Sequence, residues 1–447
     1  MTAVPSIAPR CQVSIPIQGG VSDGRPLDLR KETRSGRSTP KIRVDELRLN
    51  DSTLSADRAG VSLHDILSQA VDLGASDVHL KFGQPPVVRI DGDLAPLEGH
   101  GSFTSEALEE ILNTVGASAP RRVRLFQESG EMDTAYQLPD LPRFRVNAFR
   151  QRGDISFAFR VIPAQVPDFR GLGLPPGVEK LSEEYRGLVL VTGATGSGKT
   201  TSLAAMLGHI NRTRKQHIVS IEDPIEILHP DVNCIVNQRE VGLDTESFHE
   251  ALRRVLRQDP DVILIGELRD AETAETALQA AESGHLVLST MHTVDAAETV
   301  SRYVEFFPAA KQPQVRSILA GVLKGVVSQR LLPKIGGGRV AAVEVMIANS
   351  RIQELIREDK AEYIPEAVKE GSFFDMQTLS TALINHVIAE RVDQDVAANA
   401  APNRHDFMIQ LDRALKEHAL EQAAAAEAPA EHDSLAPALG STGAGAA

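Results

Sequence analysis

The feature that most constrains the fold is an alternation of apolar runs and amphipathic stretches between residues 187 and 291. The apolar runs read GLVLVTG, HIVSIEDP, DVILIGEL and HLVLST, and helix-like segments such as AETAETALQAAES separate them. Nearly continuous apolar strands that alternate with helices predict a parallel sheet covered by helices on both faces. Ligands of such sheets bind beyond the carboxyl ends of the strands, where all four runs become polar or charged. The sequence therefore predicts an α/β fold with a ligand site at that edge.

A glycine-rich loop follows the first of these strands and matches GxxxxGK[ST] in full. A strand before it and a helix-like segment after it are the context in which this motif binds nucleotide phosphates. The glycines let backbone N–H groups turn toward phosphate oxygens, Lys199 would neutralise the β- and γ-phosphates, and Thr200 would offer its hydroxyl to Mg²⁺. The predicted cofactors are ATP and Mg²⁺. The predicted binding residues are Gly193, Ala194, Thr195, Gly196, Ser197, Gly198, Lys199, Thr200 and Thr201.

Carboxylates stand at the ends of two further strands. Glu267 ends DVILIGE, where it could orient a water or hold the outer shell of the metal. In IEDPIE, Pro224 turns the chain off the strand, so that Glu222 and Glu226 point into the cleft as candidate general bases. Solvated loop residues are the alternative for each of these carboxylates.

The stretch GHLVLSTMHT has a histidine near each end, His285 and His292. A histidine beside a buried strand is more often a hydrogen-bonding residue of the fold than a functional one. Local sequence leaves the role of both rings open.

Length and composition predict the domain organisation. A chain of 447 residues exceeds one compact core, and its 42% apolar content supports well-packed domains. We predict a disordered arm over 1–58, a small α+β domain over 59–163, a Pro- and Gly-rich linker over 164–177, the ATPase domain over 178–412 and a disordered Ala/Pro-rich tail over 413–447.

The net charge and the cysteines argue against several classes of protein. The charge of −14 argues against a nucleic-acid-binding protein, because phosphate backbones are bound by Lys and Arg. The two cysteines are too few for a disulfide framework or a zinc quartet, which fits a reducing cytoplasm. The sequence predicts neither a secretion signal nor a membrane span.

The motifs together resemble the secretion-type ring ATPases, and within them the type IV pilus retraction ATPases of the PilT type. The resemblance covers residues 61 to 411. It rests on the phosphate loop, IEDPIE, GHLVLSTMHT and the long stretch IVNQREVGLDTESFHEALRRVLRQDPDVILIGELRD. ASDVHLKFGQPPVVRIDGD and LPRFRVNAFRQRGDISFAFRVIP are similar to the PAS-like N-terminal domain of that family. The resemblance implies a RecA-like P-loop ATPase core preceded by a PAS-like domain.

The resemblance also implies roles for individual residues. His292 belongs to the histidine box and would approach the γ-phosphate, whereas His285 would support the fold. Glu226 would be the general base and Glu267 the Walker B carboxylate. Arg145 and Arg160 match arginines that reach the nucleotide phosphates in this family, although without the resemblance they are ordinary exposed strand residues.

The implied function is an Mg²⁺-dependent ATPase, assembled as a hexameric ring, that pulls pilin subunits out of a pilus. The implied partners are the pilus machinery and an inner-membrane platform protein, on the cytoplasmic side of the membrane, and no nucleic acid. The family's AIRNLIRE-like helix here reads SRIQELIREDK, with Gln353 in place of Arg and Glu354 in place of Asn. Pilus assembly or type II secretion is therefore the alternative, although the four-cysteine module of those ATPases is missing. Alternatives of other classes are a nucleic-acid translocase and a non-hydrolysing nucleotide-binding scaffold.

Overall fold

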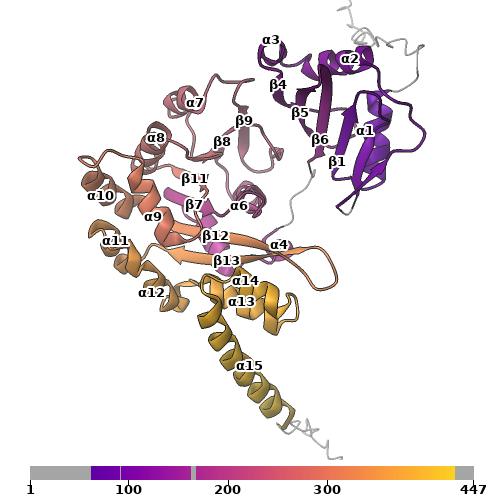
Figure 1. Ribbon diagram of the computed structural model, residues 1–447. Helices are drawn as coiled ribbons and strands as arrows, with labels where there is room; N and C mark the ends of the chain where they lie inside the picture. Colours follow the sequence, from indigo (N-terminus) through magenta and orange to yellow (C-terminus); the bar gives the residue numbers. More distant parts are fainter. Residues whose placement is uncertain (1–61, 91, 163–167, 428–447) are drawn as a thin grey trace, which may run out of the picture. The chain divides into compact units, whose positions relative to one another are not determined.

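The computed structural model describes residues 62–90, 92–162 and 168–427 (Figure 1). The arm predicted over 1–58 and the last part of the predicted tail, 428–447, lie outside the described residues. Within the described ranges, no helix combines the length and the apolar composition needed to cross a bilayer.

The N-terminal domain is an antiparallel sheet of six strands in the order β3-β2-β1-β6-β5-β4. Side chains alternate along β5 and β6, so that Val146, Phe157 and Phe159 join a core with Ile66 and Leu67 of the first helix. The strands are β1 (Asp77–Lys81), β2 (Val87–Ile90), β3 (Asp93–Pro96), β4 (Glu131–Tyr136), β5 (Phe144–Gln151) and β6 (Asp154–Val161). The helices are α1 (Leu63–Asp72), α2 (Ser105–Gly116) and α3 (Pro120–Ser129).

The ATPase domain is built on a seven-stranded sheet in the order β13-β12-β7-β11-β10-β8-β9. All neighbours are parallel except the β12–β13 pair, which forms a hairpin at one edge. This sheet confirms the α/β fold predicted from the apolar runs. The strands are β7 (Gly187–Thr192), β8 (His217–Glu222), β9 (Ile235–Glu240), β10 (Val262–Ile265), β11 (Leu286–Met291), β12 (Leu323–Pro333) and β13 (Arg339–Ile347).

Helices cover both faces of this sheet. On one face, Leu188, Ile263 and Val287 pack against the helices from α7 to α12. On the other face, Val189 and Leu288 pack against α4, α5 and α6. The helices are α4 (Phe169–Leu172), α5 (Pro176–Ser182), α6 (Lys199–Thr213), α7 (Phe248–Val255), α8 (Ala271–Glu282), α9 (Ala296–Glu305), α10 (Gln312–Val322), α11 (Ser350–Arg357) and α12 (Ile364–Lys369).

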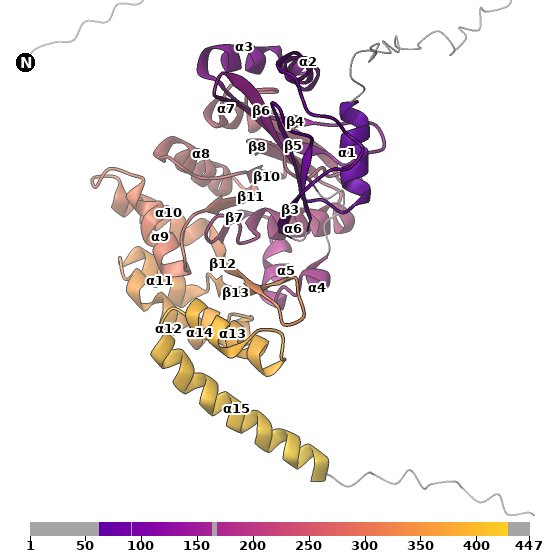
Figure 2. The same cartoon turned by 45° about the vertical axis from the view of Figure 1, so that its right-hand side comes forward.

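Two stretches differ from the predicted domain boundaries. The stretch predicted as a linker contains α4 and the start of α5, and its residues Phe169 and Leu174 are buried in the ATPase core. At the other end, α13 (Leu379–Ile388), α14 (Gln394–Ala400) and α15 (Arg404–Glu427) follow the sheet. In Figures 1 and 2, α15 projects away from β12 and β13. It continues as helix to residue 427, well into the predicted disordered tail, because alanine has the highest intrinsic helix propensity.

Candidate active site

The phosphate loop connects β7 to α6 at the carboxyl edge of the sheet. Gly193 and Gly198 have φ angles of 138° and 90°, a region that residues with a side chain rarely adopt. A Cβ atom on Gly193 would lie 2.4 Å from the backbone oxygen of Gln329, so this position also requires glycine for space. Helix α6 begins at Lys199, so its N-terminal N–H groups adjoin the loop. Such a helix end binds anions.

Lys199 is 9% exposed and lies inside the loop. Its Nζ donates to the backbone oxygens of Gly193 at 2.7 Å and Ala194 at 3.1 Å. Burial lowers the pKa of Lys199, and the charges of Glu267 and Glu226 oppose that shift. The ammonium group therefore lies beside the loop amides and under the influence of both carboxylates, where it can neutralise phosphate charge.

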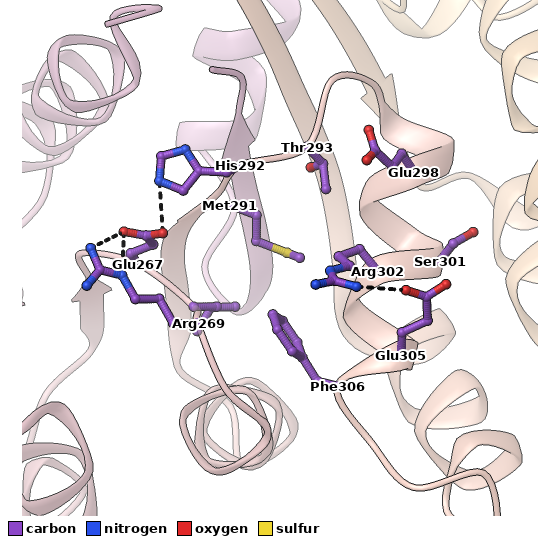
Figure 3. A pocket seen from close by; sticks show the side chains of 11 residues that line it. Glu267, Arg269, Met291, His292, Thr293, Glu298, Ser301, Arg302, Glu305 and Phe306 are labelled. Atoms are coloured by element: carbon purple, nitrogen blue, oxygen red, sulfur yellow. Dashed lines mark hydrogen bonds and ion pairs between the residues drawn. The ribbon is translucent and has the colours of Figure 1, made fainter. Parts of the chain in front are cut away.

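Glu267 and His292 stand at the ends of the neighbouring parallel strands β10 and β11. The Nε2 atom of His292 lies 2.9 Å from Oε1 of Glu267, and its Nδ1 lies 3.4 Å from Nζ of Lys199. Arg269 donates to the other oxygen of Glu267 from Nε at 2.9 Å and from Nη2 at 2.8 Å (Figure 3). His292 thus lies between the lysine of the loop and the carboxylate of the strand tip.

His285 lies at the opposite end of β11. Its Nδ1 lies 3.0 Å from the backbone oxygen of Ala280 and 3.0 Å from Oγ of Ser283, at the end of α8. The two histidines of GHLVLSTMHT are therefore separated by the whole strand, and only His292 lies at the site.

The two glutamates of IEDPIE have different surroundings. Glu222, the last residue of β8, is buried, and its Oε1 accepts from Oγ of Ser220 at 2.6 Å and from Nε2 of Gln238 at 3.0 Å. Burial raises the pKa of Glu222. Glu226 lies on the loop after the strand with a side chain that is 39% exposed. Glu226 consequently presents a solvent-accessible oxygen to the cleft, whereas one oxygen of Glu222 is already occupied within the fold.

A cavity of about 880 Å³ connects these groups, and the two predicted arginines are among its lining residues. Nη1 of Arg145 lies 3.2 Å from Oε1 of Glu226. Arg160 is 70% exposed, and its Nε donates to Oδ1 of Asp77 at 2.9 Å. Arg145 is thus paired with the candidate base, and Arg160 with a carboxylate of its own domain.

Thr200 is the residue that fits the predicted Mg²⁺ ion. It is exposed and lines the cavity one residue after Lys199. Among the described residues, no group of three or more His, Cys, Asp or Glu side chains is arranged to hold a metal ion. A single hydroxyl beside a phosphate loop nevertheless suits Mg²⁺, because this ion retains several waters and is bound largely through the phosphates of its nucleotide.

Sequence reasoning missed the groups that support the loop from β12. Nε2 of Gln329 donates to the backbone oxygen of Ser197 at 2.6 Å, and Oγ of Ser202 donates to Oε1 of Gln329 at 2.9 Å. One residue earlier, Oγ of Ser328 accepts from Oγ1 of Thr192 at 2.9 Å. The only signal for this contact was a polar Ser-Gln pair inside the apolar stretch GVVSQRLL.

Comparison with known proteins gives consistent relatives. The family model described as type II/IV secretion system protein matches residues 58–337, more than half of the chain. The type IV pilus retraction ATPase PilT of Pseudomonas aeruginosa is 45% identical over 78% of this chain and 100% of its own length. The type IV pilus ATPase PilU of the same organism is 38% identical over 77% of this chain and 90% of its own length.

A solved structure agrees with these relatives. The crystal structure of the pilus retraction motor PilT with bound ADP superposes with a TM-score of 0.73 at 44% identity, covering 78% of this chain and 99% of that one. The phosphate loop, the two strand-tip carboxylates and the histidine thus occur in a chain whose sequence and fold match one group of enzymes. The chain belongs to the type II/IV secretion system protein family, and it is an ATP hydrolase that resembles the PilT-type pilus ATPases.

Proposed function

We propose that this chain is an Mg²⁺-dependent motor, assembled as a hexameric ring, that retracts type IV pili from the cytoplasmic face of the inner membrane. The observation that carries the proposal is the match to PilT over the whole length of that retraction ATPase. Its partners on this proposal are a platform protein of the inner membrane and the pilus machinery, and no nucleic acid.

Each site residue has a separate role in the hydrolysis step. The loop amides and Lys199 bind the phosphates, while Glu226 accepts the proton of the water that attacks the γ-phosphorus. The new P–O bond forms as the bond to the β-phosphate oxygen breaks, and charge develops on that leaving oxygen. Glu267 and Lys199 hold His292 beside the γ-phosphate, where the ring can distinguish ATP from ADP. Mg²⁺, held through Thr200, would neutralise phosphate charge.

The rival function is pilus assembly or type II secretion, because Gln353 and Glu354 replace the Arg and Asn of the retraction helix. Both residues lie on α11, whose Ile352 and Ile356 are buried. The side chain of Glu354 is exposed, and Gln353 Nε2 donates to the backbone oxygen of Ala348 at 3.3 Å. The two replacements therefore alter the outer face of α11 and leave its packing intact.

Counting surface pili on cells separates the two directions of the motor. A chromosomal Lys199→Ala substitution should leave pili that extend but are not withdrawn, so that pili accumulate and twitching stops. Lys215→Ala, a change to an exposed lysine just beyond α6, is the matched control and should behave as wild type. Cells without pili would show that the motor assembles them and would overturn the retraction proposal.

The ring proposal has its own test in purified protein. If Arg145 and Arg160 complete the site of a neighbouring subunit, Arg145→Ala or Arg160→Ala should lower turnover with little change in thermal stability. An arginine supplied in this way is worth up to about 10³ to 10⁵ in rate, and a partial contributor less. Mixing either variant with Lys199→Ala protein should restore part of the activity. Unchanged turnover in both variants would show that the two arginines are ordinary surface residues.

A further inference from the structure

Glu344 occupies an unusual position in the middle of β13, opposite Ser328 of β12. Its Oε1 accepts from the backbone N–H of Ala296, the first residue of α9, at 2.9 Å. The backbone N–H of Leu379, the first residue of α13, lies close enough to lower the pKa of this carboxylate. The side chain of Glu344 is therefore bonded to the start of α9 and lies beside the start of α13, a helix far away in the sequence.

The first of these helices follows the segment that contains His292. Between His292 and Ala296, the N–H of Val294 donates to Glu298 at 2.8 Å, and the N–H of Glu298 donates to Asp295 at 2.8 Å. The hydroxyls of Thr293 and Thr299 lie 2.6 Å apart and are buried. Because these bonds tie the segment 292–295 to the first turn of α9, His292 cannot move far without the start of that helix.

The second helix is tied to the same part of β13. Backbone bonds of 2.9 and 3.1 Å join Val345 and Gln377 in both directions, and Nε2 of Gln377 donates to the backbone oxygen of Val343 at 2.7 Å. Leu379 and Leu383 of α13 then pack with Phe407 and Leu411 of α15. Movement at residues 343–345 would therefore displace the helices from α13 to α15.

Burying a carboxylate at position 344 costs free energy. Burial raises the pKa of Glu344 to about 7, the charge of Asp295 adds to the rise, and the two amides and Arg330 oppose it. An apolar or amide side chain would avoid that cost if the position served only to fill space. The geometry thus calls for an acceptor that holds the first N–H group of α9 beside the start of α13.

We infer that Glu344 is a positioning residue that couples His292 to the C-terminal helices, because its carboxylate holds the start of α9 and the next residue of its strand is bonded to Gln377, just before α13. This inference rests on the proposed place of His292 beside the γ-phosphate. When the γ-phosphate leaves, a shift of the histidine segment reaches Glu344 through Ala296 and then α13. The C-terminal helices therefore report whether the site holds ATP or ADP.

The test is hydrogen–deuterium exchange of peptides from α13 in the full-length protein with Mg²⁺ and either ADP or the non-hydrolysable analogue AMP-PNP. Wild type should show a severalfold difference in exchange between the two nucleotides. Glu344→Leu should abolish the difference, and Glu344→Gln should retain part of it, because the amide oxygen still accepts a hydrogen bond. In both variants kcat should fall about tenfold with KM for ATP nearly unchanged, the cost of slight misplacement at the site.

Two results would overturn the coupling. One is equal exchange of α13 with the two nucleotides in wild type. The other is a uniform rise in exchange in the variants that leaves the nucleotide-dependent difference in place, which a purely structural role would give. Glu344→Gln retains the size of the side chain, so it keeps the test valid if Glu344→Leu does not fold.

A matched control removes the same kind of acceptor elsewhere. Asp393 accepts from two N–H groups at the start of α14, and Asp393→Ala should leave the difference in α13 intact. Failure of the proposed function looks different, because a wild-type protein that does not bind or hydrolyse ATP gives no nucleotide states to compare. A wild type that hydrolyses ATP, with Glu344→Leu retaining the full difference, would refute the coupling alone.

Discussion

The residues on the two sides of the phosphate loop differ in chemical character. The front, defined as Lys199, Glu226, Glu267 and His292, consists of ionisable groups on the loop and on the ends of β8, β10 and β11. The back, defined as Ser328, Gln329 and Glu344, lies on the β12–β13 hairpin, and two of its three residues are neutral. The front groups face a cavity, whereas Ser328 and Gln329 are buried.

This difference separates residues that take part in ATP hydrolysis from residues that hold the phosphate loop in place. Groups of the front can change charge or exchange protons with a bound nucleotide, so their loss should affect the rate of hydrolysis. Ser328 and Gln329 of the back satisfy loop atoms, so their loss should affect affinity and stability, whereas Glu344 should affect stability directly and the rate only through His292. Four predictions test this division.

The largest effect is expected at the front, for Lys199→Ala. No other residue of the loop can neutralise the β- and γ-phosphates, so turnover should fall by at least about 10³. Steady-state ATP hydrolysis measures it, with Lys215→Ala as the control that should retain full activity. Wild-type turnover in Lys199→Ala would show that the front residues do not determine the rate of ATP hydrolysis.

The next largest effect is a loss of turnover that distinguishes Glu226 and Glu267 from Glu222. Glu226→Gln and Glu267→Gln should each bind ATP with near-normal affinity and lose about 10²- to 10³-fold in turnover, since the amide retains shape but not charge. Glu222→Gln should lose much less, because one oxygen of Glu222 is occupied by Ser220 and Gln238. Equilibrium binding of ATP, measured beside the rate, distinguishes loss of binding from loss of chemistry. Normal turnover in Glu226→Gln with none in Glu222→Gln would reverse the assignment.

A smaller effect is expected at the back, for Gln329→Leu. The change leaves the backbone oxygen of Ser197 and the hydroxyl of Ser202 without their partner, at a cost of about 1–3 kcal/mol. ADP affinity measured by calorimetry should fall about tenfold or more, because the loop is no longer held open by β12. Ser202→Ala removes one of the two bonds and should weaken binding less. Unchanged affinity in Gln329→Leu would show that the loop needs no support from the hairpin.

The smallest effect is a pH dependence at Glu344. Its folded-state pKa is raised to about 7, so its contribution to stability is full below the unfolded pKa and is lost as pH rises through 7. Relative to Glu344→Gln, wild type should therefore lose about 1 kcal/mol of unfolding free energy between pH 6 and pH 7. Urea unfolding of both proteins at the two pH values gives the difference. A constant difference would show that Glu344 does not titrate in this range.

The sequence was sufficient for most of the front. Apolar runs predicted β7, β8, β10 and β11, and the loop motif placed Lys199, because local composition and spacing determine these features. The choice between Glu222 and Glu226 was beyond local sequence, since it depends on where Ser220 and Gln238 lie in the folded sheet. The resemblance to a known family favoured Glu226, and the role of Glu226 as the general base stays a prediction.

The back was not predictable in the same way. The position of β12 beside β7 results from tertiary packing, so the polar Ser-Gln pair in GVVSQRLL indicates a buried polar contact but does not indicate that its partner is the phosphate loop. The stretch 164–177, predicted as a linker, differs from the prediction for a related reason. Its Pro and Gly residues are typical of a linker, but Phe169 and Leu174 are buried in the ATPase core. Short helices of this kind are stabilised by packing more than by local propensity.

The place of β12 between β7 and β13 has a consequence for biosynthesis. Gln329 leaves the ribosome about 130 residues after Lys199. At synthesis rates of roughly 5–20 residues per second, the loop therefore waits about 6 to 26 s for the strand that supports it. During that interval the nascent chain contains every residue of the GxxxxGK[ST] motif without the hairpin behind it. ATP in the cell can thus help the ATPase domain to fold only after the β12–β13 hairpin has emerged.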